Sequence, residues 1–117
     1  MNIDKLEGAE LDRLAYDLGL APDDCGEPET FEDNDLYLGD GSLWRPSTDL
    51  QQAVKMVKEF EASYRLEWGG QFYEEAHAVV YEKVRTFAFA STEALALTRA
   101  CVRAKMAQSE SGNSDDN

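Results

Sequence analysis

The 117-residue chain carries 24 acidic and 11 basic side chains, which gives a net charge of −13 and a pI near 4.3. This charge disfavours direct binding to nucleic-acid phosphates and to anionic membranes, and it favours a protein partner with a basic surface. The length allows one domain whose core needs neither disulfides nor metals. Residues 1–14 do not resemble a signal peptide, and no apolar run approaches the ~18 residues of a membrane span. We expect a soluble protein of a reducing cytosol with two free thiols. Neighbouring carboxylates are expected to raise the pKa of Cys25, whereas Cys101 is expected to pack in a helix as a small apolar residue.

The first helix is predicted over residues 4–18, where apolar side chains recur at helical spacing. Gly8 disfavours a helix interior by about 1 kcal/mol relative to alanine, so an ordered helix is expected to begin after it. Gly19 stands where a left-handed C-terminal cap belongs, and Pro22 follows as a stop signal.

Residues 21–40 form an acidic segment without a single Lys or Arg, and proline and glycine punctuate it as in a loop. Its acidic residues are Asp23, Asp24, Glu27, Glu29, Glu32, Asp33, Asp35 and Asp40. The pair Asp40-Gly41 between apolar residues 36–38 and 43–44 predicts a short hairpin.

A second helix is predicted over residues 49–61, because a clean apolar stripe follows Pro46. Thr48 is expected to be its N-cap and Gln51 to reach back to the Thr48 N–H, which together make a capping box. Asp49 adds a negative charge at the positive end of the helix dipole.

Residues 64–68 alternate apolar and charged side chains, which predicts a strand with Tyr64, Leu66 and Trp68 pointing inward. Residues 76–90 are rich in Val, Tyr, Phe and Thr, as sheets prefer, and they can form one long strand or two strands separated by a bend.

A third helix starts after Ser91 by the same capping logic, and the polar residues 109–117 are expected to be a disordered tail. Residues 1–108 then make a single domain. Three amphipathic helices and a small, mostly antiparallel sheet predict an α+β fold, or a layered α-β-α sandwich.

The sequence contains no complete metal-binding pattern. Asp33 and Asp35 fit the first two ligand positions of a calcium loop, but Tyr37 and Leu38 occupy the third ligand and the glycine positions. A solvated acidic loop is therefore favoured over a metal site, and no metal or cofactor is predicted.

No catalytic constellation is found either. His77 is the single histidine, and an ordinary sheet histidine is favoured over a catalytic one. A zinc site from His77, Cys25 and Cys101 would need three distant residues to converge without zinc-ligand spacing. Glu74 and Glu75 are neighbours on an extended segment and would point to opposite faces. We expect a protein that is not an enzyme.

The chain also contains a group of aromatic residues that are expected to lie mostly in the core, with one or two exposed at a contact surface. They are Trp44, Trp68, Phe72, Tyr73, Tyr81, Phe87 and Phe89.

Three segments carry a family likeness. They are Gly-Ala-Glu-Leu-Asp-Arg-Leu at residues 8–14, Arg-Pro-Ser-Thr-Asp-Leu-Gln-Gln-Ala at 45–53, and Ser-Thr-Glu-Ala-Leu-Ala-Leu-Thr-Arg-Ala at 91–100. With these segments the chain resembles the phage ABA sandwich domain over residues 5–105. The resemblance implies a compact α/β sandwich and a phage or prophage protein in the cytoplasm of a bacterial host. It implies no activity and no site residues.

The sequence thus favours a non-enzymatic protein that binds another protein. Its acidic segment and the adjacent Trp44 are the predicted contact residues. Three alternatives remain. They are an acidic inhibitor that mimics nucleic acid on a host enzyme, a structural protein that oligomerises through an edge strand or exposed aromatics, and an enzyme or small-ligand binder, which would need a buried pocket where His77 and carboxylates converge.

Overall fold

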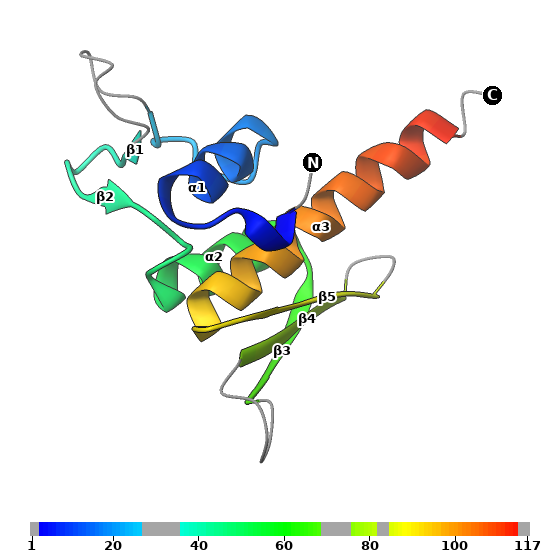
Figure 1. Cartoon of the computed structure of the whole chain (residues 1–117). Coiled ribbons are helices and arrows are strands. Elements are labelled where there is room, and N and C mark those ends of the chain that lie inside the picture. The colour runs from blue at the N-terminus through cyan, green and yellow to red at the C-terminus, as the bar shows by residue number, and fades with distance from the viewer. Residues whose placement is uncertain (1–2, 27–35, 69–75, 82–84, 115–117) are drawn as a thin grey trace.

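The computed structural model describes residues 3–26, 36–68, 76–81 and 85–114, and the protein has an α+β fold, as the sequence predicted. In these ranges the elements are η1 (Ile3–Lys5), α1 (Gly8–Asp17), β1 (Leu36–Tyr37), β2 (Leu43–Trp44), α2 (Leu50–Glu59), β3 (Ser63–Trp68), β4 (Ala76–Tyr81), β5 (Arg85–Ala90) and α3 (Glu93–Ser114). The strands form a two-stranded sheet, β1-β2, and a separate three-stranded sheet, β3-β4-β5 (Figure 1).

The three-stranded sheet is antiparallel throughout. The β-rich run after residue 75 is two strands, β4 and β5, in which Val79 lies opposite Phe87 and His77 opposite Phe89. On its other side β4 pairs with β3, where Arg65 lies opposite Val79. Residues 82–84, where a bend was expected, lie outside the described residues.

Small side chains let α3 approach the sheet closely. Directly opposed residues of an antiparallel pair share a face, and the helix-facing positions of β4 and β5 are filled mainly by alanine. They are Ala76, Ala78, Val80, Thr86, Ala88 and Ala90. The matching part of α3 is buried and also rich in small residues, including Ala100, Cys101 and Ala104. Two surfaces of small side chains can pack at short distance without voids.

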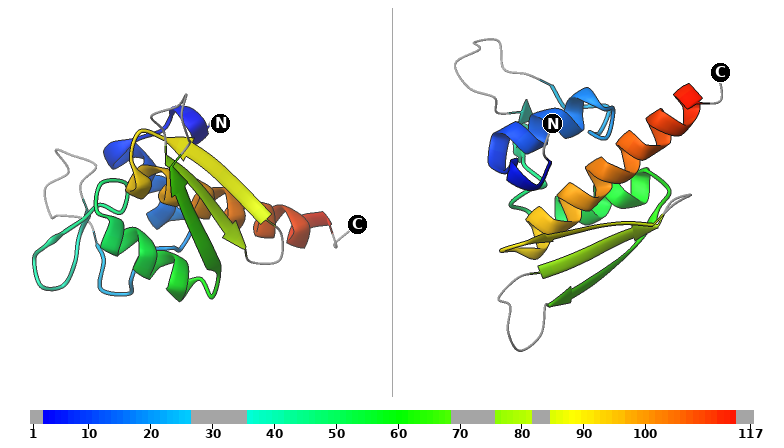
Figure 2. Two further views of the ribbon diagram at one scale, coloured as in Figure 1. Left: turned by 90° about the horizontal axis from the view of Figure 1, so that it is seen from below. Right: turned by 45° about the vertical axis from the view of Figure 1, so that its right-hand side comes forward.

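The helices gather on one side of this sheet. α3 packs on β4 and β5, and α1 and α2 pack against α3. Both views in Figure 2 and the view in Figure 1 place the opposite face of the sheet away from all three helices. A sandwich with helices on both faces is therefore not confirmed for the described part of the chain.

The first helix is shorter than the periodicity suggested. A 3₁₀ turn at Ile3–Lys5 precedes α1, and Gly8 at its start has a φ of +60°. The helix ends as predicted, because Gly19 has a φ of +84° and caps it. The Gly19 N–H donates to the Tyr16 carbonyl and the Leu20 N–H to the Ala15 carbonyl, each at 3.0 Å, which is a Schellman motif.

The predicted capping box at the start of α2 is wrong by one residue. Asp49, and not Thr48, is the N-cap, and its side chain accepts from the Gln52 N–H at 3.2 Å. The Thr48 and Asp49 N–H groups both donate to the Arg45 carbonyl, so the chain is still turning at Thr48. Gln52 also stabilises this entry, since its side chain accepts from the Arg45 N–H and donates to the Leu43 carbonyl.

The predicted hairpin is confirmed between β1 and β2, with Leu36 opposite Trp44. Gly41 has a φ of +89°, a conformation that favours glycine, and the Asp40 carboxylate accepts from the Ser42 N–H and hydroxyl. Trp44 is only 2 % exposed and belongs to the core.

Two further expectations differ from the structure. α3 continues through Ser114, so residues 109–114 are helical where a disordered tail was expected. An existing helix can extend without a new nucleation step, and polar residues do not prevent this extension.

The second difference concerns β3. Tyr64 and Leu66 share the helix-facing side of the sheet with Val80 and Ala78, yet Tyr64 is exposed because β3 is an edge strand. The side chain of Trp68 lies outside the described part.

Candidate interaction surface

The face of the sheet that points away from the helices carries a group of large apolar and aromatic side chains. We call this group the aromatic face; it consists of His77, Val79 and Tyr81 of β4 with Phe87 and Phe89 of β5. Phe87 is 50 % exposed and Phe89 is 47 % exposed, and Tyr81 is also exposed. Monomeric soluble proteins seldom expose contiguous apolar side chains of this size unless they serve as a contact surface.

The arrangement follows from the period of two along a strand. In β5, Thr86, Ala88 and Ala90 point toward α3, so the alternate residues Phe87 and Phe89 point away from it. The sheet therefore places its small side chains inside and its large ones outside. An ordinary two-layer domain does the reverse, because large side chains bury the most apolar area against the helices.

The rings of the aromatic face pack on one another. The His77 ring stacks on Phe89 with a centroid distance of 4.5 Å and an interplanar angle of 13°, and it meets Phe87 edge-on at 6.0 Å. Phe87 and Phe89 are themselves in edge contact at 6.4 Å. These contacts leave the rings ordered, so they form a pre-arranged surface.

The free edge of β5 is capped by two arginines of α3. Arg99 Nη1 donates to the Phe89 carbonyl at 3.2 Å, and Arg103 Nη1 donates to the Phe87 carbonyl at 2.8 Å. Arg99 is only 7 % exposed, and its Nε donates to the Leu6 carbonyl at 3.0 Å. With two of its carbonyls taken, this edge is a poor template for an added strand.

The predicted contact residues of the acidic segment divide into three groups. Asp23, Asp24 and Asp40 are exposed. Trp44 is in the core and cannot contact a partner on the folded surface. The other five lie outside the described residues: Glu27, Glu29, Glu32, Asp33 and Asp35.

Two of the exposed carboxylates are held by local hydrogen bonds. Asp24 Oδ2 accepts from the Gly39 N–H at 3.1 Å, which ties the start of the acidic segment to the hairpin. The bonds from the Ser42 hydroxyl and N–H to Asp40 lower the pKa of that carboxyl. The Asp40 side chain thus shapes the hairpin turn, and that of Asp24 joins two segments 15 positions apart.

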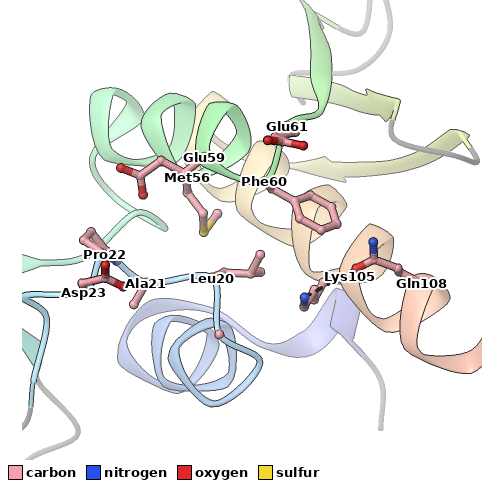
Figure 3. A pocket seen from close by; sticks show the side chains of 11 residues that line it. Leu20, Ala21, Pro22, Asp23, Met56, Glu59, Phe60, Glu61, Lys105 and Gln108 are labelled. Carbon is pink, nitrogen blue, oxygen red and sulfur yellow. Dashed lines mark hydrogen bonds between the residues drawn. The ribbon is translucent and has the colours of Figure 1, made fainter. Parts of the chain in front are cut away.

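A cleft of about 560 Å³ opens where α1 and α2 end beside α3. Figure 3 shows Asp23 and Glu59 on one side of this cleft and Lys105 on the other. Lys105 Nζ lies 5.5 Å from the centroid of the Phe60 ring, a cation–π contact. Three carboxylates, those of Asp23, Glu59 and Glu61, line the cleft together with this one amine, so its lining carries a net negative charge.

The structure does not bring together the three residues of the imagined zinc site. His77 is on the aromatic face, whereas Cys101 is buried in α3. Among the described residues, no group of His, Cys, Asp and Glu side chains is arranged to hold a metal ion.

Both cysteine thiols are free. Burial, with a smaller contribution from the Asp24 charge, raises the pKa of Cys25 to about 11, and burial raises the pKa of Cys101 to about 12. The predicted direction for Cys25 is confirmed, although burial is the larger cause.

Within the described ranges, no helix is both long and apolar enough to cross a bilayer. Comparison with family models, curated proteins and solved structures finds no match to the chain. The resemblance to the phage ABA sandwich domain therefore stays a prediction.

Sequence reasoning missed the aromatic face, since it assigned Tyr81, Phe87 and Phe89 mainly to the core. The alternation of Phe87 and Phe89 with Ala88 and Ala90 was the available signal. It shows that two large residues share a face, but it does not show which face the helices cover.

Proposed function

We propose that this protein acts without catalysis, by binding other protein surfaces through its aromatic face. The observation that supports the proposal is the inverted sheet: Phe87 and Phe89 are about half exposed, while alanines occupy the covered side. Aromatic side chains are enriched at protein interfaces and carry much of their binding energy. The proposal therefore moves the contact surface from the acidic segment to the sheet.

The phage or prophage origin and a basic partner are part of this proposal. The acidic surface around Asp23, Asp24 and Asp40 would attract a basic protein and repel nucleic acid. This attraction would raise the association rate more than the affinity. Conserved neighbours among the surrounding genes would test the phage origin, because phage functions cluster.

A second candidate is the acidic mimic of nucleic acid. The local bonds of Asp24 and Asp40 favour it, since mimicry needs carboxylates at fixed positions. In that case binding would depend on these carboxylates and would weaken steeply with salt.

Affinity capture from an extract of the source cells separates the two candidates. The bait would be compared with two variants, Phe87→Ser/Phe89→Ser and Asp23→Asn/Asp24→Asn/Asp40→Asn. Contact through the aromatic face predicts that proteins bound to the wild-type bait are lost from the first variant and retained by the second. The opposite pattern would establish the acidic mimic, and an unchanged set on both variants would contradict both candidates.

A further inference from the structure

We propose that the aromatic face is covered by the same face of a second copy, so that two three-stranded sheets pack face to face in a two-fold dimer. This inference rests on the proposed function and adds a second copy of the chain as an occupant of the same face. An isologous contact of this kind needs one patch that is complementary to itself, and a cluster of apolar rings meets that requirement.

Charge restricts which partner suits this face. Among the described residues, the charged side chains on the same side of the sheet are Arg65, Glu67 and Arg85, and Arg65 Nη2 pairs with Glu67 Oε1 at 2.7 Å. Glu7 and Arg103, of opposite charge, line the groove beside Phe87 and Phe89. These five charged side chains carry no net negative charge, although the whole chain carries −13. The excess negative charge therefore lies on other surfaces, and two acidic copies repel one another least when they approach through this face.

The sheet edges favour contact through the face over strand addition. Arg99 and Arg103 occupy the carbonyls of Phe89 and Phe87 at the β5 edge. At the opposite edge, β3 carries the charged pair Arg65 and Glu67, and charged edge strands resist pairing with another chain. Face-to-face packing leaves both edges as they are and buries the rings, as in a β-sandwich.

The size of the face sets the expected strength. Three strands of six residues each span roughly 20 Å by 10–14 Å. Such a patch, roughly 200–280 Å², is about a third of the roughly 800 Å² that each partner buries in a standard interface. We therefore expect a weak, reversible dimer that is populated only at high protein concentration.

Sedimentation velocity over about 1 to 500 µM protein would measure this equilibrium directly. Phe87→Ser/Phe89→Ser should weaken dimerisation by at least about 100-fold, since two central aromatic contacts are lost. The control is Tyr37→Ser, which removes an exposed aromatic ring from the β1-β2 hairpin and should leave the dissociation constant unchanged. Circular dichroism and the melting temperature of each variant would show that it is folded.

Ionic strength gives a second readout. Because both copies carry −13, raising NaCl from about 50 to about 500 mM should screen their repulsion and tighten the dimer several-fold. A strictly monomeric protein at all concentrations and salt levels would overturn the inference. Equal dimerisation of the wild type and the Phe87→Ser/Phe89→Ser variant would overturn it as well.

Cross-linking locates the contact. A single new thiol from His77→Cys, on the central strand of the face, should be joined to its counterpart by a bis-maleimide. Tyr37→Cys should give no covalent dimer, and buried Cys25 and Cys101, with raised pKa values, should contribute little background near neutral pH. If His77→Cys cross-links no better than Tyr37→Cys, the face-to-face dimer is wrong.

These results are separable from the proposed function. A monomeric protein whose captured partners still depend on Phe87 and Phe89 would overturn only the second copy as occupant. Loss of that dependence would contradict the proposed function itself.

Discussion

Asp12 joins the first helix to the segment that leads into α2. It is buried, and its two carboxylate oxygens accept from the Ser47 N–H and the Ser47 hydroxyl, each at 2.9 Å. The two residues are 35 positions apart in the chain. A buried carboxylate is stable only with such partners, so the contact fixes how these two segments meet.

Replacing Asp12 by Ala should lower the free energy of unfolding by about 3 kcal/mol, because the buried Ser47 N–H would lose its acceptor and Arg45 its ion-pair partner. The Ser47 hydroxyl would keep the Gly8 carbonyl, at 3.3 Å, as an acceptor. The matched control is Asp17→Ala on the same helix. Asp17 is exposed and lies 3.5 Å from Arg13 Nε, and its loss should cost less than about 0.5 kcal/mol. Urea unfolding of both variants measures the difference. Equal losses in the free energy of unfolding would show that the buried contact stabilises the fold no more than the exposed ion pair does.

The two buried thiols predict a pH dependence of stability. Thiols in the unfolded chain ionise near pH 9, whereas those of Cys25 and Cys101 keep their protons until about pH 11 and 12 in the fold. Unfolding above pH 9 therefore releases protons, so the free energy of unfolding should be unaffected by the thiols below pH 9 and should fall as pH rises above it.

Urea unfolding in the presence of a reductant between pH 8 and pH 10.5 tests this. Each thiol contributes at most about 1.4 kcal/mol per pH unit to the fall. The variant Cys101→Val removes one of the two groups and should lose stability less steeply than the wild type above pH 9. Parallel curves for the two proteins would contradict the prediction.

At the scale of elements, the end of α2 holds a residue in an unfavourable conformation. The Ala62 N–H donates to the Val57 carbonyl and the Glu61 N–H to the Lys58 carbonyl, which is the bond pattern of the Schellman motif at Gly19. Here the left-handed position is taken by Glu61, with a φ of 60°. A side chain in this region costs roughly 1–2 kcal/mol.

Glu61→Gly should therefore raise the free energy of unfolding by about 0.5–1 kcal/mol, since the strain relieved exceeds the added entropy of the unfolded chain. Gly19→Ala is the converse control and should lower stability by about 1 kcal/mol, because it introduces the same strain at a φ of +84°. Thermal and urea unfolding should agree on both signs. A loss of stability in Glu61→Gly would mean that its side chain has a role at the cleft.

These elements also show how far sequence reasoning reaches. The helix cap at Gly19 and the turn at Asp40-Gly41 were predictable because each depends on only a few adjacent residues. The bond between Asp12 and Ser47 was not predictable, since no local pattern marks partners 35 positions apart. The N-cap moved from Thr48 to Asp49 because adjacent residues of similar capping preference compete, and packing chooses between them.

The candidate surface depended on information from the whole molecule. The sequence shows that Phe87 and Phe89 share one side of a strand. Which side is buried depends on how closely α3 can approach, and the alanines of β4, β5 and α3 set that distance. Acidic residues were easier to notice, yet charge alone indicates solubility as readily as a contact surface.

The same net charge of −13 should make the stability of the whole protein sensitive to salt. Like charges repel more strongly in the compact state than in the unfolded chain, and the cleft adds to this repulsion because three carboxylates, those of Asp23, Glu59 and Glu61, line it with one amine. Raising NaCl from about 20 to about 300 mM should increase the free energy of unfolding by about 1–2 kcal/mol and the melting temperature by several degrees.

The measurement is best made at low protein concentration on the Phe87→Ser/Phe89→Ser variant, so that self-association does not contribute. Adding Asp23→Asn and Glu59→Gln to this variant removes two of the three carboxylates of the cleft. It should then be more stable at low salt and respond less to added salt, because less repulsion is left to screen. If both proteins respond to salt equally, the repulsion is spread over the whole surface and the cleft is not its centre.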